Sequence, residues 1–192
     1  DGAPLLVVRD LSLKSPYQHG SDLRDIGFEV RAGEILGVAG IAGNGQRELM
    51  GALIGEILVD QADSIIIDGA AVGRSGPNQR RIAGFCFVPE ERLGHGAVPQ
   101  MSLWENAFLS AATRLKLLDH GFLNVRRSTA YAADIVRDFR VKTPGVGNSA
   151  ASLSGGNLQK FIIGREIMQD PGVIIVMQPT WGVDAGSAAS IR

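Results

Sequence analysis

A glycine-rich loop at residues 40–45 separates an apolar run at residues 35–39 from a segment of helical character. A strand, a glycine loop and a helix in this order form a phosphate-binding loop, because backbone N–H groups at the start of the helix face the anion. The motif G-x-x-x-x-G-K-[ST] matches at both glycines. It fails at its last two positions, where Gln46 and Arg47 stand. We therefore predict an α/β fold around a phosphate loop that lacks its two chemically active side chains.

The composition is that of an ordinary globular domain. The 192 residues suffice for one domain with a sizeable core and a small subdomain, with 45% apolar and 20% charged residues. A net charge of −1 gives no electrostatic basis for binding nucleic acid or anionic lipid. No apolar stretch reaches the roughly 18 residues that a membrane span requires. Because the chain lacks an initial methionine and ends in an expected helix, we interpret it as part of a longer protein.

Cysteine and histidine give no sign of a metal site. The single cysteine, Cys86, lies in an apolar run, which predicts a buried structural thiol and weakly favours a reducing compartment. His19, His95 and His120 are scattered without the spacing of metal ligands.

The chain changes from strand to helix character near Met101. Before it, we expect a helix that ends near Gly55, and strands at 5–8, 27–30, 35–39, 65–67 and 82–88. After it, Ser102 and Glu105 form a capping box. We expect helices over 103–115, 128–141 and 157–169, a loop over 144–148, and a strand over 173–177 that is covered on both faces.

A second motif lies at residues 153–157, Leu-Ser-Gly-Gly-Asn, and is the most specific string in the chain. Ser154 is placed to cap a helix, while Gly155 and Gly156 expose backbone N–H groups at the positive end of the helix dipole. A lone Ser-Gly-Gly is more often a simple helix start. Here it follows the glycine loop and precedes an aliphatic strand and the string QPTWGVD, which favours a phosphate-binding role.

Together these strings resemble the ATP-binding domain of ABC transporters. The resemblance places Walker A at 40–47, the signature at 153–157, Walker B at 173–178 and the D-loop at 182–184. It implies a P-loop NTPase fold of ABC type, with a mostly parallel core sheet, an N-terminal antiparallel β part and a helical subdomain. The core would comprise residues 1–100 and 151–192, truncated at its C-terminus, and the helical signature subdomain would comprise 101–150.

The strings GEILGVAGIAGNGQREL, VPEERLGHGAV and MSLWEN narrow the resemblance. They are similar to the second of two fused ABC domains in ATPases of bacterial simple-sugar and nucleoside importers. The resemblance implies a partner ABC domain in the same polypeptide, transmembrane permease subunits and, indirectly, a periplasmic or lipoprotein solute-binding protein. It also implies a peripheral location at the cytoplasmic face of the inner membrane.

Four positions depart from the family's catalytic pattern. Gln46 replaces the lysine, Arg47 the magnesium-binding hydroxyl, Met177 the Walker B aspartate and Gln178 the general base. A thioether is not an oxygen ligand for Mg²⁺, and a neutral amide cannot accept a proton as a base. We therefore expect no metal and no hydrolysis at this site, with weak ATP binding and an empty structural loop as open alternatives.

Several residues receive roles from the resemblance. The backbone N–H groups of residues 40–45 would hold phosphate without the lysine. Tyr17 lies where the family places an adenine-stacking aromatic, although a partly buried surface tyrosine is equally consistent. Glu90 lies at the Q-loop position, and Asp184 in the D-loop. The signature would serve the partner's ATP site. The nucleotide-binding set comprises Gly40, Gly43, Asn44, Gly45, Gln46, Arg47 and Tyr17, and the signature residues are Ser154, Gly155, Gly156 and Asn157.

Three alternatives to this asymmetric pair can be tested. A self-sufficient ATPase that uses Gln46 and Arg47 in another way would turn over Mg-ATP as an isolated domain. A non-transport ABC scaffold would carry zinc modules, basic surfaces or long coiled-coil insertions, and none is apparent in the sequence. A dinucleotide oxidoreductase requires G-x-G-x-x-G, which fails after Gly45. The transported solute and a switch histidine, expected beyond Arg192, are not encoded here.

Overall fold

The computed structural model describes residues 2–179 of the chain. The chain divides into two compact units, Asp1–Phe85 and Cys86–Arg192, which we call the first and second unit. The division into a core of residues 1–100 with 151–192 and a helical subdomain of 101–150 stays a prediction.

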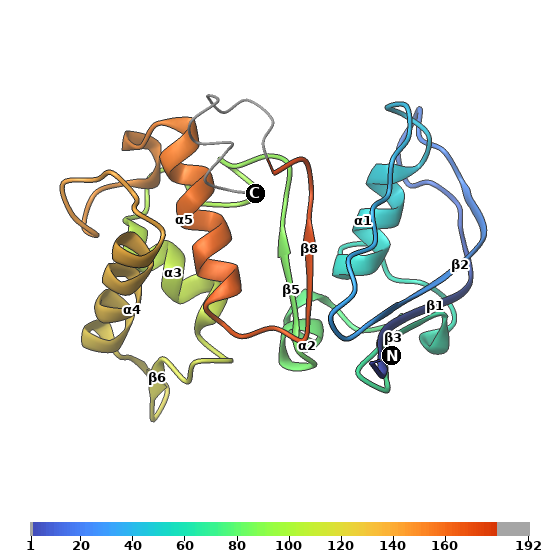
Figure 1. The fold of residues 1–192 in the computed structure, drawn as a ribbon, viewed down its shortest axis with the longest axis horizontal. Helices are drawn as coiled ribbons and strands as arrows, with labels where there is room; N and C mark the ends of the chain where they lie inside the picture. Colours follow the sequence, from blue (N-terminus) through green and yellow to red (C-terminus); the bar gives the residue numbers. More distant parts are fainter. Residues whose placement is uncertain (1, 180–192) are drawn as a thin grey trace. The chain divides into compact units, whose positions relative to one another are not determined.

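An antiparallel sheet dominates the first unit, as predicted (Figure 1). Its strands are β1 (Pro4–Leu13), β2 (Leu23–Arg31), β3 (Ile65–Ile67) and β4 (Ala70–Ala71), in the order β2-β1-β3-β4. Alternating residues of β1 face the core, and Leu6 and Val8 lie opposite Ile67 and Ile65 of β3. All four side chains are at most 3% exposed, so this pairing anchors the sheet.

Two α-helices of the first unit interleave with the sheet strands, one between β2 and β3 and one after β4. The helix α1 (Gln46–Ile54) ends at Gly55, whose positive φ of 87° terminates it where the sequence predicts. The sequence does not predict α2 (Pro77–Ile82), which begins with proline at its first position. Position 82, expected in a strand, is the last residue of α2.

Arg80 of α2 is fully buried and completes the C-terminal end of α1. Its guanidinium donates to the carbonyl oxygens of Leu53 at 2.7 Å, Ser75 at 2.9 Å and Gly73 at 3.3 Å, and to that of Ala52. Burial lowers the pKa of Arg80 to about 10. The side chain thus supplies donors to carbonyl groups that the end of a helix leaves unpaired.

The prediction of a strand at residues 35–39 is wrong. No strand within the described residues includes these positions, and every residue from 35 to 39 is exposed, Ile35 to 96%. A strand is stabilised by its neighbours, and an aliphatic run alone does not form one. The sequence pattern correctly identifies a β-prone segment but does not supply the pairing.

Three α-helices and two short two-stranded sheets form the described part of the second unit. The helices are α3 (Leu103–Ala111), α4 (Val125–Asp138) and α5 (Gly155–Ile167). One sheet pairs β5 (Phe85–Val88) with β8 (Val173–Val176), and the other pairs β6 (Leu118–Asp119) with β7 (Phe122–Leu123). The first residue of β5 belongs to the first unit. The predicted loop over 144–148 contains no helix or strand. The expected double covering of β8 is not observed, because its residues are half-buried or exposed.

Side-chain caps determine where these helices begin. The predicted capping box is confirmed: Ser102 Oγ accepts from the Glu105 N–H at 3.3 Å, and the Ser102 N–H donates to Glu105 Oε2 at 2.8 Å. Asn124 caps α4 by accepting from the Arg127 N–H at 2.9 Å. The cap explains why α4 begins three residues earlier than the predicted 128.

The core of the second unit lies among α3, α4 and α5. Gly164 allows close approach of α4's end, because a Cβ at this position would lie 2.6 Å from Phe139 Cδ2. The Tyr131 hydroxyl of α4 donates to the Arg165 carbonyl at 2.5 Å. Cys86 is fully buried and forms no disulfide, as predicted.

A network of buried side chains fixes the loop between β5 and α3. Arg165 of α5 donates to the Gly96 carbonyl at 2.8 Å and forms an ion pair with Glu166 at 2.9 Å. Asn106 of α3 accepts from the Val98 N–H at 2.8 Å and donates to the Val98 carbonyl at 3.1 Å. The loop is therefore held by two helices that lie far apart in sequence.

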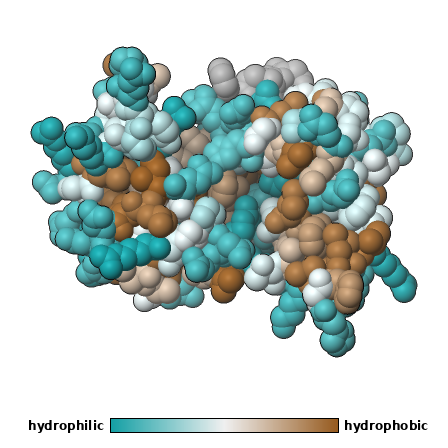
Figure 2. All heavy atoms as spheres, turned by 180° about the vertical axis from the view of Figure 1, so that it is seen from behind, coloured by the Kyte–Doolittle hydropathy of each residue, from teal (hydrophilic) through white to brown (hydrophobic). Residues whose placement is uncertain are grey.

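The surface carries separate apolar patches and polar areas (Figure 2). The hairpin β6–β7 contributes exposed Leu118, Phe122 and Leu123. Among the described helices none has both the length and the apolar character needed to cross a membrane.

Candidate nucleotide and signature sites

The glycine loop of the first unit is bridged by the side chain of Gln46. The Gln46 amide accepts from the Asn44 N–H at 3.1 Å and donates to the Ile41 carbonyl at 2.9 Å. The amide nitrogen lies so close to Gly40 that a Cβ there would be 2.6 Å from it. Gly45 has a φ of 94°, which directs the chain into α1. The Gln46 side chain therefore fills the loop with the protein's own hydrogen-bonding groups.

The Arg47 guanidinium lies over the ring of Tyr17. The Arg47 guanidinium carbon lies 3.7 Å from the centroid of the Tyr17 ring, which is cation–π geometry. Arg47 is exposed and Tyr17 half-buried. The structure thus brings Tyr17 to the glycine loop, while Arg47 covers a face of its ring.

Glu48, which the sequence analysis did not single out, ties this region together. Its Oε1 accepts from Ser15 Oγ at 2.8 Å and from the Ser21 N–H at 3.0 Å, and Ser21 Oγ donates to the Gly43 carbonyl at 2.6 Å. Burial raises the pKa of Glu48, but these hydrogen bonds, its backbone N–H and the charge of Arg47 outweigh burial and lower it. Glu48 therefore lies ionised beneath the segment that carries Tyr17.

The signature residues begin α5 in the second unit. Ser154 is exposed and caps the helix by accepting from the Asn157 N–H at 3.4 Å. The Asn157 side chain accepts from the Lys142 N–H at 2.8 Å and donates to Ser154 Oγ at 2.9 Å. Gly155 and Gly156 lie in the first turn, where backbone N–H groups have no acceptor within the helix. Asn157 thus positions Ser154, while the two glycines supply donors.

The residues predicted to form Walker B and the Q-loop also lie in the second unit. The Met177 N–H donates to the Val88 carbonyl at 2.9 Å, so Met177 continues the pairing of β8 with β5. Gln178 is exposed, and Glu90 is half-buried after β5. The predicted D-loop residue, Asp184, lies outside the described residues.

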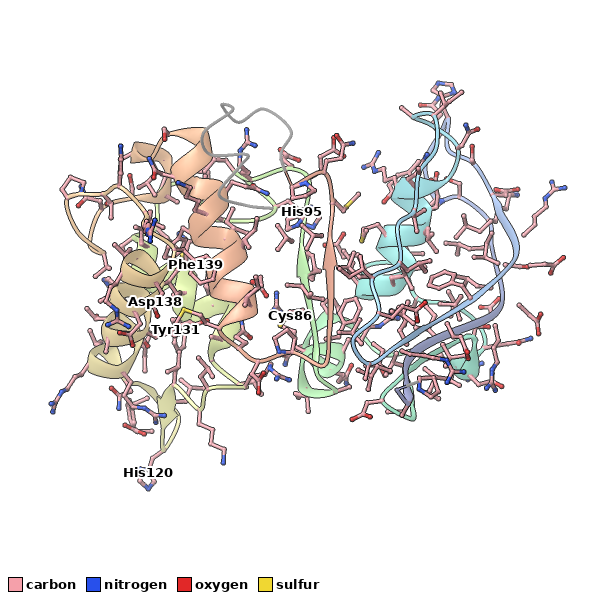
Figure 3. The ribbon with its side chains drawn as sticks, in the orientation of Figure 1. Cys86, His95, His120, Tyr131, Asp138 and Phe139 are labelled. Atoms are coloured by element: carbon pink, nitrogen blue, oxygen red, sulfur yellow. The ribbon has the colours of Figure 1, made fainter. Side chains whose placement is uncertain are left out.

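The residues at these positions do not fit Mg²⁺. Magnesium takes hard oxygen ligands, whereas Arg47 presents a cation and Met177 a thioether. The described part of the chain contains no group of three or more His, Cys, Asp or Glu that could hold a metal. Figure 3 shows Cys86, His95 and His120 at separate places in the second unit.

Sequence reasoning missed the side-chain contacts that organise both sites. Glu48 lies three residues after Gly45, in the first turn of α1, but nothing in the sequence pairs it with Ser15 and Ser21. The partnership of Arg165 with Gly96 spans 69 positions. An acidic residue in a first helical turn is the only signal that pointed toward Glu48.

Comparison with solved structures defines the class of protein. The dimeric structure of an ATP-binding cassette bound to ADP and phosphate matches with a TM-score of 0.76 and 17% identity, over 97% of this chain and 79% of that one. The ATP-binding subunit of an ABC transporter matches with a TM-score of 0.72 and 25% identity, over 97% and 71%. The fold is thus the α/β fold of a P-loop NTPase, as predicted.

The sequence model described as ABC transporter matches residues 23–180, and the chain belongs to that family. The ribose import ATP-binding protein RbsA 1 of Rubrobacter xylanophilus is 40% identical over 99% of this chain and 36% of its own length. The nucleoside import ATP-binding protein NupA of Lactococcus lactis is 39% identical over 98% and 37%. The chain thus spans about a third of the length of these relatives.

Proposed function

We propose that the chain is a nucleotide-binding domain of an ATP-driven importer of simple sugars or nucleosides. Membership of the ABC transporter family and the similarity to import ATP-binding proteins support this assignment. The choice of solute belongs to other subunits in such an importer. The chain would act from the cytoplasmic face of the bacterial inner membrane, against permease subunits that receive solute from a binding protein.

The domain's own nucleotide site would bind ATP weakly and not hydrolyse it. In P-loop enzymes a lysine, a hydroxyl and an acidic residue hold phosphate and Mg²⁺, and a further group orients the attacking water. Gln46, Met177 and Gln178 supply none of these functions, and the cation of Arg47 can face a phosphate but cannot hold Mg²⁺. The backbone N–H groups of residues 40–45 would hold phosphate once Gln46 is displaced.

The domain would act on ATP through its signature. The observation that carries this proposal is the exposed Ser154 hydroxyl at the start of α5, held by Asn157 and followed by two glycines. Such a helix start binds phosphate through backbone N–H groups and the helix dipole. The γ-phosphate in question would lie on a second ABC domain of the same polypeptide, with Asp184 beside it. The greater length of the relatives leaves room for that domain.

The proposal is tested by substituting Ser154 in the whole protein that contains this chain and measuring its ATP turnover. Ser154→Asp keeps a good helix cap but places negative charge against the phosphate, so ATP turnover should be lost while the fold is retained. Ser152→Ala alters an exposed serine two residues earlier and should leave turnover intact. Full turnover in Ser154→Asp would reject the signature role.

The self-sufficient ATPase is the competing outcome. Purified chain with Mg-ATP should show no turnover above background. Turnover that scales with the concentration of the chain and disappears in Gln46→Ala would establish hydrolysis at its own loop instead.

A further inference from the structure

We propose that Arg47 makes the binding of a base and the binding of phosphate at the first unit interdependent. In the ligand-free protein Arg47 covers the ring of Tyr17; a phosphate anion draws the guanidinium away and thereby opens the ring for a base. The inference rests on the proposed nucleotide binding at this loop and names the residue that selects nucleotides over nucleosides.

The ring of Tyr17 is not available on the face that Arg47 occupies. The guanidinium carbon lies 3.7 Å from the ring centroid, within the range of direct stacking. A planar base needs the same kind of contact with the ring. A base and Arg47 therefore compete for this face.

The phosphate position is occupied in a similar way. The Gln46 amide accepts from the Asn44 N–H at 3.1 Å, a donor that would otherwise face a bound anion. Gln46 also donates to the Ile41 carbonyl at 2.9 Å. An arriving phosphate can replace Gln46 as acceptor and offers Arg47 a charge-assisted partner.

The backbone that carries Tyr17 is fixed, so the side chains are the parts that move. Glu48 holds Ser15 and Ser21 on either side of Tyr17, and Ser21 holds Gly43 in the glycine loop. The Tyr17 N–H donates to Ser15 Oγ at 3.2 Å, and its carbonyl accepts from the Gly20 N–H at 3.1 Å. Arg47, one residue before Glu48, is exposed and long enough to leave the ring without backbone change.

The strengths of the two contacts determine the order of events. An exposed cation–π contact is weaker than a hydrogen bond between charged partners, so phosphate wins the competition for Arg47. A nucleoside carries no anion, so its binding must itself supply the free energy that displaces Arg47 from the ring. A nucleotide carries both the base that replaces Arg47 on the ring and the phosphate that replaces Gln46 as acceptor. The cation of Arg47 also takes the place of a metal beside the phosphate.

The test uses the whole protein that the reading frame encodes, with fluorotyrosine in place of Tyr17. The fluorine NMR signal then reports this ring alone. In EDTA, inorganic tripolyphosphate should raise the affinity for adenosine about fivefold, the factor that corresponds to one exposed cation–π contact. Adenosine should raise the affinity for tripolyphosphate by the same factor. Arg47→Ala should bind adenosine about fivefold more tightly without tripolyphosphate and show no further increase with it. Arg9→Ala, an exposed arginine on β1, should behave as wild type.

Equal adenosine affinity in wild type and Arg47→Ala, or no effect of tripolyphosphate on wild type while ATP binds, would overturn the role of Arg47 and leave nucleotide binding intact. A fluorine signal that ATP does not shift in either protein would reject nucleotide binding at this loop, and the role of Arg47 with it.

Discussion

Arg80→Met should lower the free energy of unfolding of the first unit by about 3–5 kcal/mol. The buried guanidinium donates to four carbonyl oxygens, two of them, from Ala52 and Leu53, in the last turn of α1. Each buried acceptor left without a donor costs about 1–3 kcal/mol. Methionine fills much of the same space with an unbranched chain, so the loss reports mainly the missing donors. Urea unfolding of the chain, followed by circular dichroism, measures it.

Arg74→Met provides the matched comparison, because exposed Arg74 donates to a single carbonyl, that of Asp60, at 2.6 Å. It should change stability far less than Arg80→Met. A loss below about 1 kcal/mol for Arg80→Met would refute the assignment of Arg80 as the cap of α1.

Arg80→Lys should make stability depend on pH. Burial lowers the pKa of Arg80 to about 10, and an amine starts about 2 units lower than a guanidinium. The unfolded chain then binds more protons than the folded chain in the mildly alkaline range, so the variant should gain stability as pH rises there. Wild type should gain stability only above about pH 10. A flat profile for the variant would contradict the burial of the charge.

Three further predictions concern the other buried or substituted groups. Because the pKa of Glu48 is lowered from its ordinary 4.5, wild type should lose stability as pH falls below that value, and Glu48→Gln should lose less in urea titrations over the same range. Arg165→Met removes the ion-pair partner that lies 2.9 Å from buried Glu166 and should cost about 3–5 kcal/mol in urea unfolding. The double variant with Glu166→Leu should recover most of that loss, and no recovery would contradict the ion pair as its cause. ATP binding monitored by fluorotyrosine at position 17 should be the same in EDTA as in Mg²⁺, and a strong requirement for the metal would contradict the role of Arg47.

Local signals predicted most of the helices and strands. Gly55 ends α1, and Ser102 with Glu105 starts α3, because each feature depends only on neighbouring residues. The alternation in β1 and the aliphatic run of β8 likewise identify strands. The strand expected at 35–39 was wrong because the formation of a strand depends on a partner, which no local pattern specifies.

The sequence identified the functional motifs but not the contacts that their side chains make. The substitutions at Gln46 and Arg47 are evident in the sequence, whereas the contacts of Gln46 with Asn44 and of Arg47 with Tyr17 appear only in three dimensions. Glu48 bonds to residues 27 and 33 positions earlier. Such distant pairings are set by packing of the whole unit, so one sequence cannot reveal them.

The anchoring of Arg165 has a kinematic consequence for the signature helix. Ten residues separate Gly155 from Arg165, which at 1.5 Å per residue is about 15 Å along the axis of α5. The helix is therefore stiff, with the proposed phosphate-binding turn at one end and the Gly96 loop attached further along. A stiff rod does not stretch, so any displacement of Ser154 reaches the loop as a tilt or a translation. Spin labels at Ser152 and Val98 should therefore keep one separation.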